Sequence, residues 1–457
     1  IMTLYILGYI YATRPATLNG FLYTVFISNI HHSSIYEYLY TVFIHKYEAV
    51  RYLIDYSKFY SKLSRSIKAS EIRELLAIIK EKKDVISFAG GIPDPRLFPK
   101  KELAEIAYYV VEKYGDYALQ YSETKGIREA RTAICKLLEK ARNIKCEPED
   151  LIITTGSQSA LDIVARALID PEDIVFTESP SYLAALGAFK NAGAKLIGVK
   201  IDDEGMDTYL LEDMLKKISQ GERGRVKFLY TIPIAQNPAG VTMNLERRKH
   251  LLEIASRYDF LILEDDPYGY LVFEKDIDTT PLKALDKEDR VIYLGTVSKI
   301  LAPGLRIGWI LANHDLTRKF ELLKQYIDLH APTLNQYIVA EAVERGLIDA
   351  VVQRALPHYK TKRDAMLDAI NEYLPDYIWS SKPVGGLFIF IYVFKQGFDA
   401  GAVLPRAINE YKIAYVPGKS FHPDGSGANS MRLNFSYPTI EQIHEGIKRL
   451  GELIKES

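Results

Sequence analysis

Apolar runs alternate with amphipathic runs along most of the chain after about residue 64. The apolar runs carry few polar residues on either face, as strands buried between two layers of helices do. The longer runs between them repeat their apolar residues at helical spacing. This alternation predicts an α/β domain with a largely parallel central sheet. The predicted strands are LIITT (151–155), DIVFTE (173–178), KFLYTIP (227–233), FLILED (260–265) and VIYLGTV (291–297).

The pattern of apolar and polar residues changes on both sides of this α/β region. Helical patterns dominate after about residue 330, until the strand-like runs VGGLFIFIYV and SMRLNFSY, and they predict a second, smaller α+β domain. Before the region, residues 68–85 have helical spacing, with Ser70 placed to cap the helix. We therefore expect an extension at 1–63, an N-terminal helix and arm at 64–95, a large domain at 96–330 and a small C-terminal domain at 331–457.

Residues 1–63 differ from the rest of the chain. The first sixty residues hold 11 of the 32 tyrosines, and the hexapeptide LYTVFI occurs twice, at 22–27 and 39–44. We interpret the segment either as a contact arm or as sequence translated upstream of the true start. The first interpretation predicts ordered, packed structure. The second predicts that the native protein begins well past Tyr60.

Composition excludes several classes of protein. Of 457 residues, 48% are hydrophobic, which is enough for large cores and rules out wholesale disorder. The net charge of −1 argues against a dedicated nucleic-acid binder, which would carry a basic surplus. We expect no membrane span, because no apolar stretch reaches about 18 residues. We expect no secretory signal, because the N-terminus lacks a basic start and a small-residue cleavage site. Cys135 and Cys146 are expected to be reduced thiols of a cytoplasmic protein, because two cysteines make neither a disulfide framework nor a four-ligand zinc site.

Candidate chemistry follows the predicted strands, where ligands bind in open α/β sheets. Gly156-Ser157-Gln158 comes after LIITT and opens a helix, whose free N–H groups and positive dipole end suit a phosphate. An ordinary N-cap is the alternative interpretation. Tyr182 begins the helix after DIVFTE. It is either a ring that stacks on a flat heteroaromatic group or a partly buried core tyrosine.

The next two strands are followed by an amide and by carboxylates. Asn237, in QNPAG, is either a turn residue or a donor to a phenolate-like oxygen that Tyr268 would share. Asp265, at the end of FLILED, can hold a pyridine nitrogen protonated, and burial would require a cationic partner for it. Metal binding by this acidic cluster is the rival interpretation, but no His ligands occur at helpful spacing, so we expect no metal site.

The segment VIYLGTVSKILAPGLRIGWI carries the strongest signal. Lys299 follows a strand among small and apolar residues, where desolvation and nearby cations lower a lysine pKa and make the amine nucleophilic toward aldehydes. Ser298 adds a hydroxyl for a phosphate, and Arg306 adds a fork of donors. Arg432 lies in the apolar run SMRLNFSY. It indicates either a bound substrate carboxylate or a structural ion pair.

The order of these signals resembles the fold-type I pyridoxal-phosphate enzymes, and specifically the class I/II aminotransferases. Within them the chain is similar to the branch with kynurenine/2-aminoadipate aminotransferases and archaeal multi-substrate aminotransferases. The resemblance covers about residues 64–457. It rests on the motifs FAGGIPDPRLFP, LQYSETKGIREAR, TTGSQSALD, ESPSY, QNPAG, EDDPYGYL, SKILAPGLRIGW and MRLNFS.

The resemblance implies a role for each candidate residue. Lys299 would bond the aldehyde of pyridoxal 5′-phosphate, Asp265 would pair with its ring nitrogen, and Tyr182 would stack on its ring. The ring hydroxyl oxygen would contact Asn237 and Tyr268. A homodimer is implied, because Tyr121 in LQYS would reach the phosphate of the partner subunit. The phosphate would also be held by Ser157, Gln158, Ser298 and Arg306, and the substrate by Arg432, Gly91, Asn237, Ser70 and Arg73.

The implied reaction is transamination by a ping-pong mechanism. An aromatic amino acid, kynurenine or 2-aminoadipate would give its amino group to a 2-oxo acid such as 2-oxoglutarate, with Lys299 moving the α-proton. One alternative keeps the cofactor but changes the reaction to that of a C–S lyase, racemase or decarboxylase. Another is a transcriptional regulator with an aminotransferase-like sensor domain, which would need a basic winged-helix reader near the N-terminus.

Overall fold

The computed structural model describes residues 55–67, 75, 82 and 84–457. The chain divides into two units, residues 1–68 and 69–457. In the first unit, the described residues form η1 (Tyr56–Phe59) and α4 (Lys62–Ser66). Both LYTVFI repeats lie outside the described residues, as do the substrate candidates Ser70 and Arg73.

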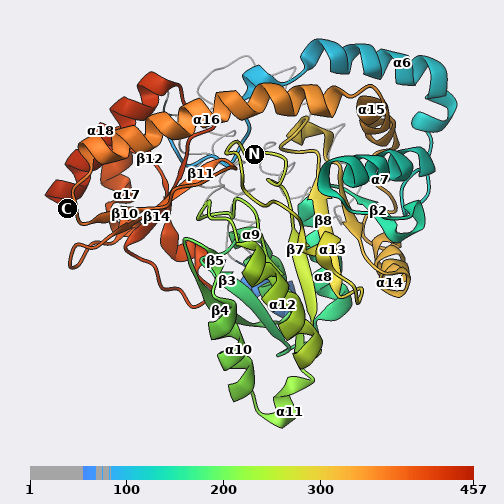
Figure 1. The fold of residues 1–457 in the computed structure, drawn as a ribbon, viewed down its shortest axis with the longest axis horizontal. Coiled ribbons are helices and arrows are strands. Elements are labelled where there is room, and N and C mark those ends of the chain that lie inside the picture. The colour runs from blue at the N-terminus through green and yellow to red at the C-terminus, as the bar shows by residue number, and fades with distance from the viewer. Residues whose placement is uncertain (1–54, 68–74, 76–81, 83) are drawn as a thin grey trace, which may run out of the picture. The chain divides into compact units, whose positions relative to one another are not determined.

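The second unit is built around a mixed but mainly parallel sheet (Figure 1). The four inner pairings that join β4, β3, β6, β7 and β8 are parallel, whereas β9 is antiparallel to both of its neighbours. This confirms the predicted α/β fold. The strand order is β2 (Leu151–Thr154), β9 (Gly308–Leu311), β8 (Val291–Thr296), β7 (Leu261–Asp265), β6 (Val226–Thr231), β3 (Ile174–Ser179), β4 (Lys195–Asp202) and β5 (Gly205–Met206).

Two cores on opposite faces of the sheet explain why the strands are apolar at successive positions. The in-register row Phe176, Leu229, Ile262 and Val291 packs with α10 and α12. The next row contains Tyr230, Leu263 and Ile292, which pack with α8 and α9 on the other face, because successive strand residues point to opposite sides. The four helices are α8 (Ser157–Leu168), α9 (Leu183–Asn191), α10 (Thr208–Lys217) and α12 (Leu245–Tyr258).

Further helices surround this sheet. α6 and α7 both pack against α15, and α14 packs against α8. Short helical turns connect the strands. The bounds of these helices and turns are α6 (Lys100–Ala118), α7 (Arg128–Arg142), α11 (Gln220–Arg223), α13 (Leu282–Leu285), α14 (His314–Gln325), α15 (Thr333–Glu344), η2 (Pro95–Leu97), η3 (Pro148–Asp150) and η4 (Pro303–Leu305).

A second sheet lies near the C-terminus, and its four strands are antiparallel, as an α+β domain requires. The long helix α16 (Leu347–Tyr373) runs from α15 to this sheet, where it packs against α18 (Figure 1). The strand order is β10 (Ile378–Ser380), β11 (Phe388–Val393), β14 (Ser430–Asn434) and β13 (Val416–Pro417). The remaining elements are α17 (Ala400–Asn409), η5 (Gly418–Phe421), α18 (Ile440–Glu456) and a parallel pair of β1 (Ile86–Ser87) with β12 (Ile413–Ala414).

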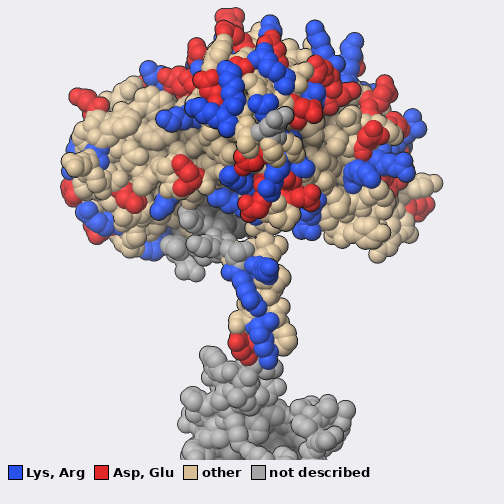
Figure 2. Space-filling model, turned by 90° about the horizontal axis from the view of Figure 1, so that it is seen from below, with Lys and Arg blue, Asp and Glu red and all other residues tan. Residues whose placement is uncertain are grey.

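The described surface mixes both signs of charge. In Figure 2, Lys and Arg side chains alternate with Asp and Glu across much of the described face, in keeping with 58 basic and 59 acidic residues. Within the described part of the chain, none of the helices has the length and apolar composition that crossing a bilayer would require.

Candidate active site

Five candidate residues follow strands of the large sheet, and all lie at the same edge. Ser157 follows β2, Tyr182 follows β3, Asn237 follows β6, Asp265 ends β7 and Lys299 follows β8. β2 runs in the same direction as β8, because both are antiparallel to β9. The carboxyl ends of these strands therefore meet at one edge, which is where open α/β sheets bind ligands.

Lys299 lies in the turn between β8 and β9, and its side chain is half-buried. Its Nζ donates a hydrogen bond to the carbonyl of Gly91 at 2.8 Å. Burial, reinforced by the nearby guanidinium groups of Arg432 and Arg306, lowers the pKa of Lys299 to about 8. A lysine with this pKa is partly neutral near physiological pH, so it can act as a nucleophile and as a base.

Asp265 is 2% exposed and has an incomplete set of hydrogen bonds. Its Oδ2 accepts from the hydroxyl of Tyr230 at 2.9 Å, whereas Oδ1 is buried without a partner. Burial raises the pKa of Asp265 to about 7, although the Tyr230 bond opposes the shift. The sequence predicted a cationic partner for this carboxylate, and the described residues supply only a phenol. The free oxygen is therefore available to a cation that enters from outside the chain.

The neighbouring carboxylate of Asp266 does have a cation. Its Oδ2 accepts from Arg142 Nε at 2.9 Å and from the Tyr293 hydroxyl at 2.8 Å. Arg142 comes from the last turn of α7, and its Nη1 also donates to the Gly269 carbonyl at 3.1 Å. Arg142 thus neutralises the charge next to Asp265 without contacting Asp265 itself.

The turn after β2 forms a small polar cradle. Gly156 is the N-cap of α8 with φ +82°, and a Cβ at this position would lie 2.3 Å from Arg306 Nη2. Arg306 Nη2 donates to the Thr155 carbonyl at 3.2 Å. The Oγ of Ser157 is buried and has no hydrogen-bond partner in the described part of the chain. A buried hydroxyl, a helix N-terminus and a guanidinium at one turn are features that suit an anion.

The amide of Asn237 connects this edge with the C-terminal sheet. Its Oδ1 accepts from Arg432 Nη1 at 2.9 Å, and its side chain also bonds Tyr268. Tyr182 is half-buried and close enough to Tyr268 and Arg432 to affect their pKa values. The four side chains therefore form one cluster.

Arg432 is buried on β14 with no carboxylate partner among the described residues. Its guanidinium lies 4.2 Å from the ring centre of Phe388 and 5.2 Å from that of Phe421. Nη2 donates to the Ala89 carbonyl at 3.1 Å, whereas Nε has no partner. Burial lowers the pKa of Arg432 to about 10. Burial of a guanidinium without an anion costs free energy, so this position of Arg432 favours binding of an anion.

The segment that contains Gly91 is fixed from two sides. Asp94 is 1% exposed, and its Oδ2 lies 3.0 Å from Lys362 Nζ and 2.8 Å from His358 Nε2, both on α16. On the other side, the Ser436 hydroxyl donates to the Ile92 carbonyl at 2.7 Å. These bonds hold the segment between Lys299 and Arg432.

Three further sequence candidates have no contact with the side chains described above among the described residues. Gln158 is exposed on the first turn of α8. Tyr121 is 79% exposed, and its ring packs edge-on against His330 at 5.8 Å. Ser298 is half-buried, and its Oγ lies 2.9 Å from Thr296 Oγ1. Their contacts with a ligand stay predictions.

Sequence reasoning missed several residues that shape the site. Tyr230 bonds Asp265, Phe388 and Phe421 flank Arg432, and Arg142 neutralises Asp266. Glu178 accepts from Gln236 Nε2 at 2.9 Å and so holds the loop that carries Asn237. The only local signal was the polar atom of Tyr230 or Glu178 within an otherwise apolar run.

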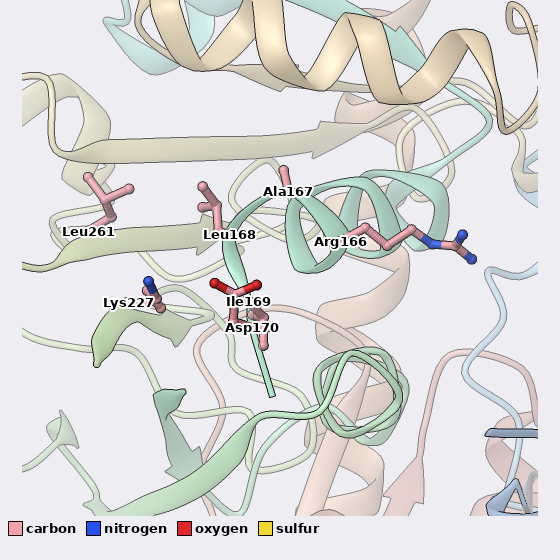
Figure 3. A pocket seen from close by; sticks show the side chains of 7 residues that line it. All are labelled: Arg166, Ala167, Leu168, Ile169, Asp170, Lys227 and Leu261. Carbon is pink, nitrogen blue, oxygen red and sulfur yellow. The ribbon is translucent and has the colours of Figure 1, made fainter. Parts of the chain in front are cut away.

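A separate pocket of about 270 Å³ lies at the opposite edge of the sheet (Figure 3). It is next to the first residues of β6 and β7 and the end of α8, and in Figure 3 the Arg166 side chain extends away from Lys227. Its distance along the strands from Asp265 separates it from the cluster around Lys299. It is lined by Arg166, Ala167, Leu168, Ile169, Asp170, Lys227 and Leu261.

Comparisons with known proteins agree with this geometry. The family described as aminotransferase class I and II matches residues 83–450. Aromatic-amino-acid aminotransferase 1 of Thermococcus litoralis is 47% identical over 403 residues, which are 88% of this chain and 95% of that protein. The structure of Pyrococcus horikoshii kynurenine aminotransferase, solved with PMP, has a TM-score of 0.84 and 46% identity, over 88% of this chain and 98% of that one. Thermus thermophilus α-aminoadipate aminotransferase, complexed with N-(5′-phosphopyridoxyl)-L-leucine, has a TM-score of 0.80 and 37% identity, over 88% and 99%.

Proposed function

Because the chain belongs to the class I and II aminotransferases, we propose that it moves the amino group of an aromatic amino acid, kynurenine or 2-aminoadipate to a 2-oxo acid such as 2-oxoglutarate. The enzyme is a pyridoxal-phosphate-dependent aminotransferase. The choice of donors rests on the names of its relatives. One structural observation carries the proposal: the low-pKa amine of Lys299 lies within electrostatic reach of Arg432, a buried guanidinium that has no carboxylate partner among the described residues.

The residues fit pyridoxal phosphate at the points where the protein leaves polar atoms unsatisfied. Asp265 Oδ1 suits a protonated ring nitrogen, and Ser157 Oγ suits a phosphate oxygen. Arg306 lies beside Gly156, where a Cβ would collide with its guanidinium. We propose that Ser298 and Gln158 add phosphate contacts, that Asn237 and Tyr268 bond the ring hydroxyl, and that Tyr182 covers the ring.

The cofactor supplies an aldehyde for the amine and a cationic ring that withdraws electrons from the substrate α-carbon. The chain has the remaining tasks. Asp265 keeps the ring nitrogen protonated, because its buried carboxylate gains a cationic partner. Arg432 and the backbone around Gly91 bind the α-carboxylate. Lys299 removes the α-proton and later returns a proton, as an amine with a pKa of about 8 can do.

A homodimer is part of this proposal. Tyr117, Leu119 and Tyr121 are 68–79% exposed, and Tyr326 is 91% exposed. The contact of Tyr121 with His330 places the two exposed segments side by side. A second copy of the chain would cover these apolar side chains and bring Tyr121 to the phosphate of the other subunit. Light scattering tests this proposal, since a dimer has twice the chain mass of 52.0 kDa.

The function is tested by a panel of amino donors with 2-oxoglutarate, in which glutamate formation is measured. We expect aromatic amino acids, kynurenine or 2-aminoadipate to give the highest kcat/KM. The K299A variant serves as the matched blank. Release of sulfide, carbon dioxide or the D-isomer without glutamate would instead identify a lyase, decarboxylase or racemase.

Replacing Arg432 with glutamine should weaken substrate binding. The amide cannot form two parallel charged bonds to a carboxylate, and we expect kcat/KM to fall roughly 10²- to 10³-fold, mainly through KM. R432K keeps the charge but loses the fork and the contact with Phe388, so it should be intermediate. Steady-state kinetics with the preferred donor measure both, with cofactor content checked by absorbance. An unchanged KM in both variants would remove Arg432 from the substrate site.

Replacing Gly156 with alanine should weaken cofactor binding. The new Cβ would lie 2.3 Å from Arg306 Nη2 and would sit on a residue with φ +82°. Loss of one or two charged hydrogen bonds to the phosphate should raise the cofactor Kd about 10- to 100-fold. Titration of apoenzyme with pyridoxal phosphate measures the change. The matched control is G304A in η4, where a Cβ meets no atom within 4 Å. Equal Kd values for G156A and G304A would argue against a phosphate at this turn.

A further inference from the structure

The two cysteines of the chain, which the sequence analysis expected to be reduced thiols, lie in contact. Cys135 is on the buried face of α7 and is 8% exposed, and Cys146 follows the helix and is partly exposed. Their sulfur atoms are 2.6 Å apart. Both side chains pack against the same apolar core.

The end of α7 produces this encounter. The helix ends at Arg142, and Asn143 adopts the left-handed conformation with φ 53°. The backbone N–H groups of Asn143 and Ile144 both bond the Leu138 carbonyl, and Ile144 is 2% exposed. A left-handed cap of this kind reverses the chain. The reversal brings Cys146 back beside Cys135, two helical turns before the end of α7.

We propose that Cys135 and Cys146 are a site of reversible covalent modification, at which an intramolecular disulfide closes the end of α7. The oxidant is a small-molecule disulfide. The Cys146 thiolate attacks it and releases one small thiol, and then the Cys135 thiolate attacks the Cys146 sulfur and releases the second. Two electrons pass to the oxidant, and the two protein protons end on the two released thiols. Cys146 reacts first, because it is the more exposed of the pair.

The closed ring would contain Arg142, which connects this site with the active site. Arg142 must hold its position to pair with Asp266, the residue next to Asp265. A disulfide between Cys135 and Cys146 restricts the intervening residues in the unfolded chain as well as in the native structure, where they form the last two turns of α7 and its cap. The modification therefore stabilises the helix end that delivers Arg142.

The test exposes the reduced holoenzyme to oxidised glutathione and counts thiols after acid quenching and denaturation. We expect both thiols to disappear together, with a mass loss of two hydrogen atoms and a peptide that joins the two cysteines. In the reduced enzyme, the hydrogen bond with Cys135 and burial both raise the pKa of the Cys146 thiol. Disulfide formation should therefore be faster at higher pH, where more of the thiolate is present. C146S should keep a single unreacted thiol, because Cys135 is buried.

Two outcomes overturn the proposal. One is the persistence of both thiols in the native enzyme, and the other is a stable glutathione adduct on Cys146 without ring closure. Thermal unfolding tests the stabilising role, since the oxidised enzyme should unfold about 2–6 °C above the reduced one. C135S/C146S should match the reduced enzyme under both conditions. Equal Tm values for oxidised and reduced wild type would show that the ring does not stabilise α7.

Discussion

Replacing Lys299 with alanine should lower the rate of transamination roughly 10⁴-fold, because the variant loses its nucleophile and its proton carrier together. The surroundings of the amine explain the size of the effect. Burial and two guanidinium groups lower its pKa to about 8, and Nζ donates a hydrogen bond to the carbonyl of Gly91, which lies beside Arg432. No other lysine among the described residues combines a pKa this low with a position at the carboxyl edge of the sheet.

The measurement combines glutamate formation with cofactor content. K299A should still bind pyridoxal phosphate without a covalent bond, because Ser157, Arg306 and Asp265 are unchanged. Borohydride treatment should label wild type on the peptide that contains Lys299 and leave K299A unlabelled. K319A, at an exposed position of α14, is the matched control and should keep the wild-type rate. Wild-type turnover by K299A would refute the assigned site.

The placement of the site could be predicted from the sequence because it depends on local order. Apolar runs identify buried strands, and the residue after each run lies at the carboxyl edge of a parallel sheet. Ser157, Tyr182, Asn237, Asp265 and Lys299 all follow this rule. Their contacts with a cofactor remain proposals.

The details that tune the site depend on contacts between distant residues. Tyr230 reaches Asp265 across 35 residues, and Arg142 reaches Asp266 across 124. The rings of Phe388 and Phe421 meet on Arg432 only once the second sheet has formed. Strand register and helix docking decide such contacts, and neither is encoded in one short motif. The same reason explains why the sequence did not predict the contact between Cys135 and Cys146.

Replacing Asp265 with asparagine should lower kcat roughly 10²- to 10³-fold, with little change in the fold. The amide keeps the size of the side chain but cannot stabilise a positive charge on the ring nitrogen, so the electron demand at the α-carbon falls. D213N, at a side chain that is 62% exposed, controls for the substitution itself. Kinetics and the cofactor absorbance spectrum measure the effect. A variant with wild-type kcat would contradict the pairing of Asp265 with the ring.

Stability of the apoenzyme gives a second test that needs no turnover. Burial raises the pKa of Asp265 from 3.8 to about 7, so the folded protein binds this proton more tightly than the unfolded chain does. The stability that this proton contributes is fully present below pH 3.8 and is lost as the pH rises from there through about 7. Asparagine does not titrate. The Tm of apo D265N relative to apo wild type should therefore rise as the pH increases from 3.8 to about 7 and stay constant above that, and pyridoxal phosphate should reverse the order by supplying the missing cation. A Tm difference that is constant with pH would mean that the carboxylate already has a partner in the apoenzyme.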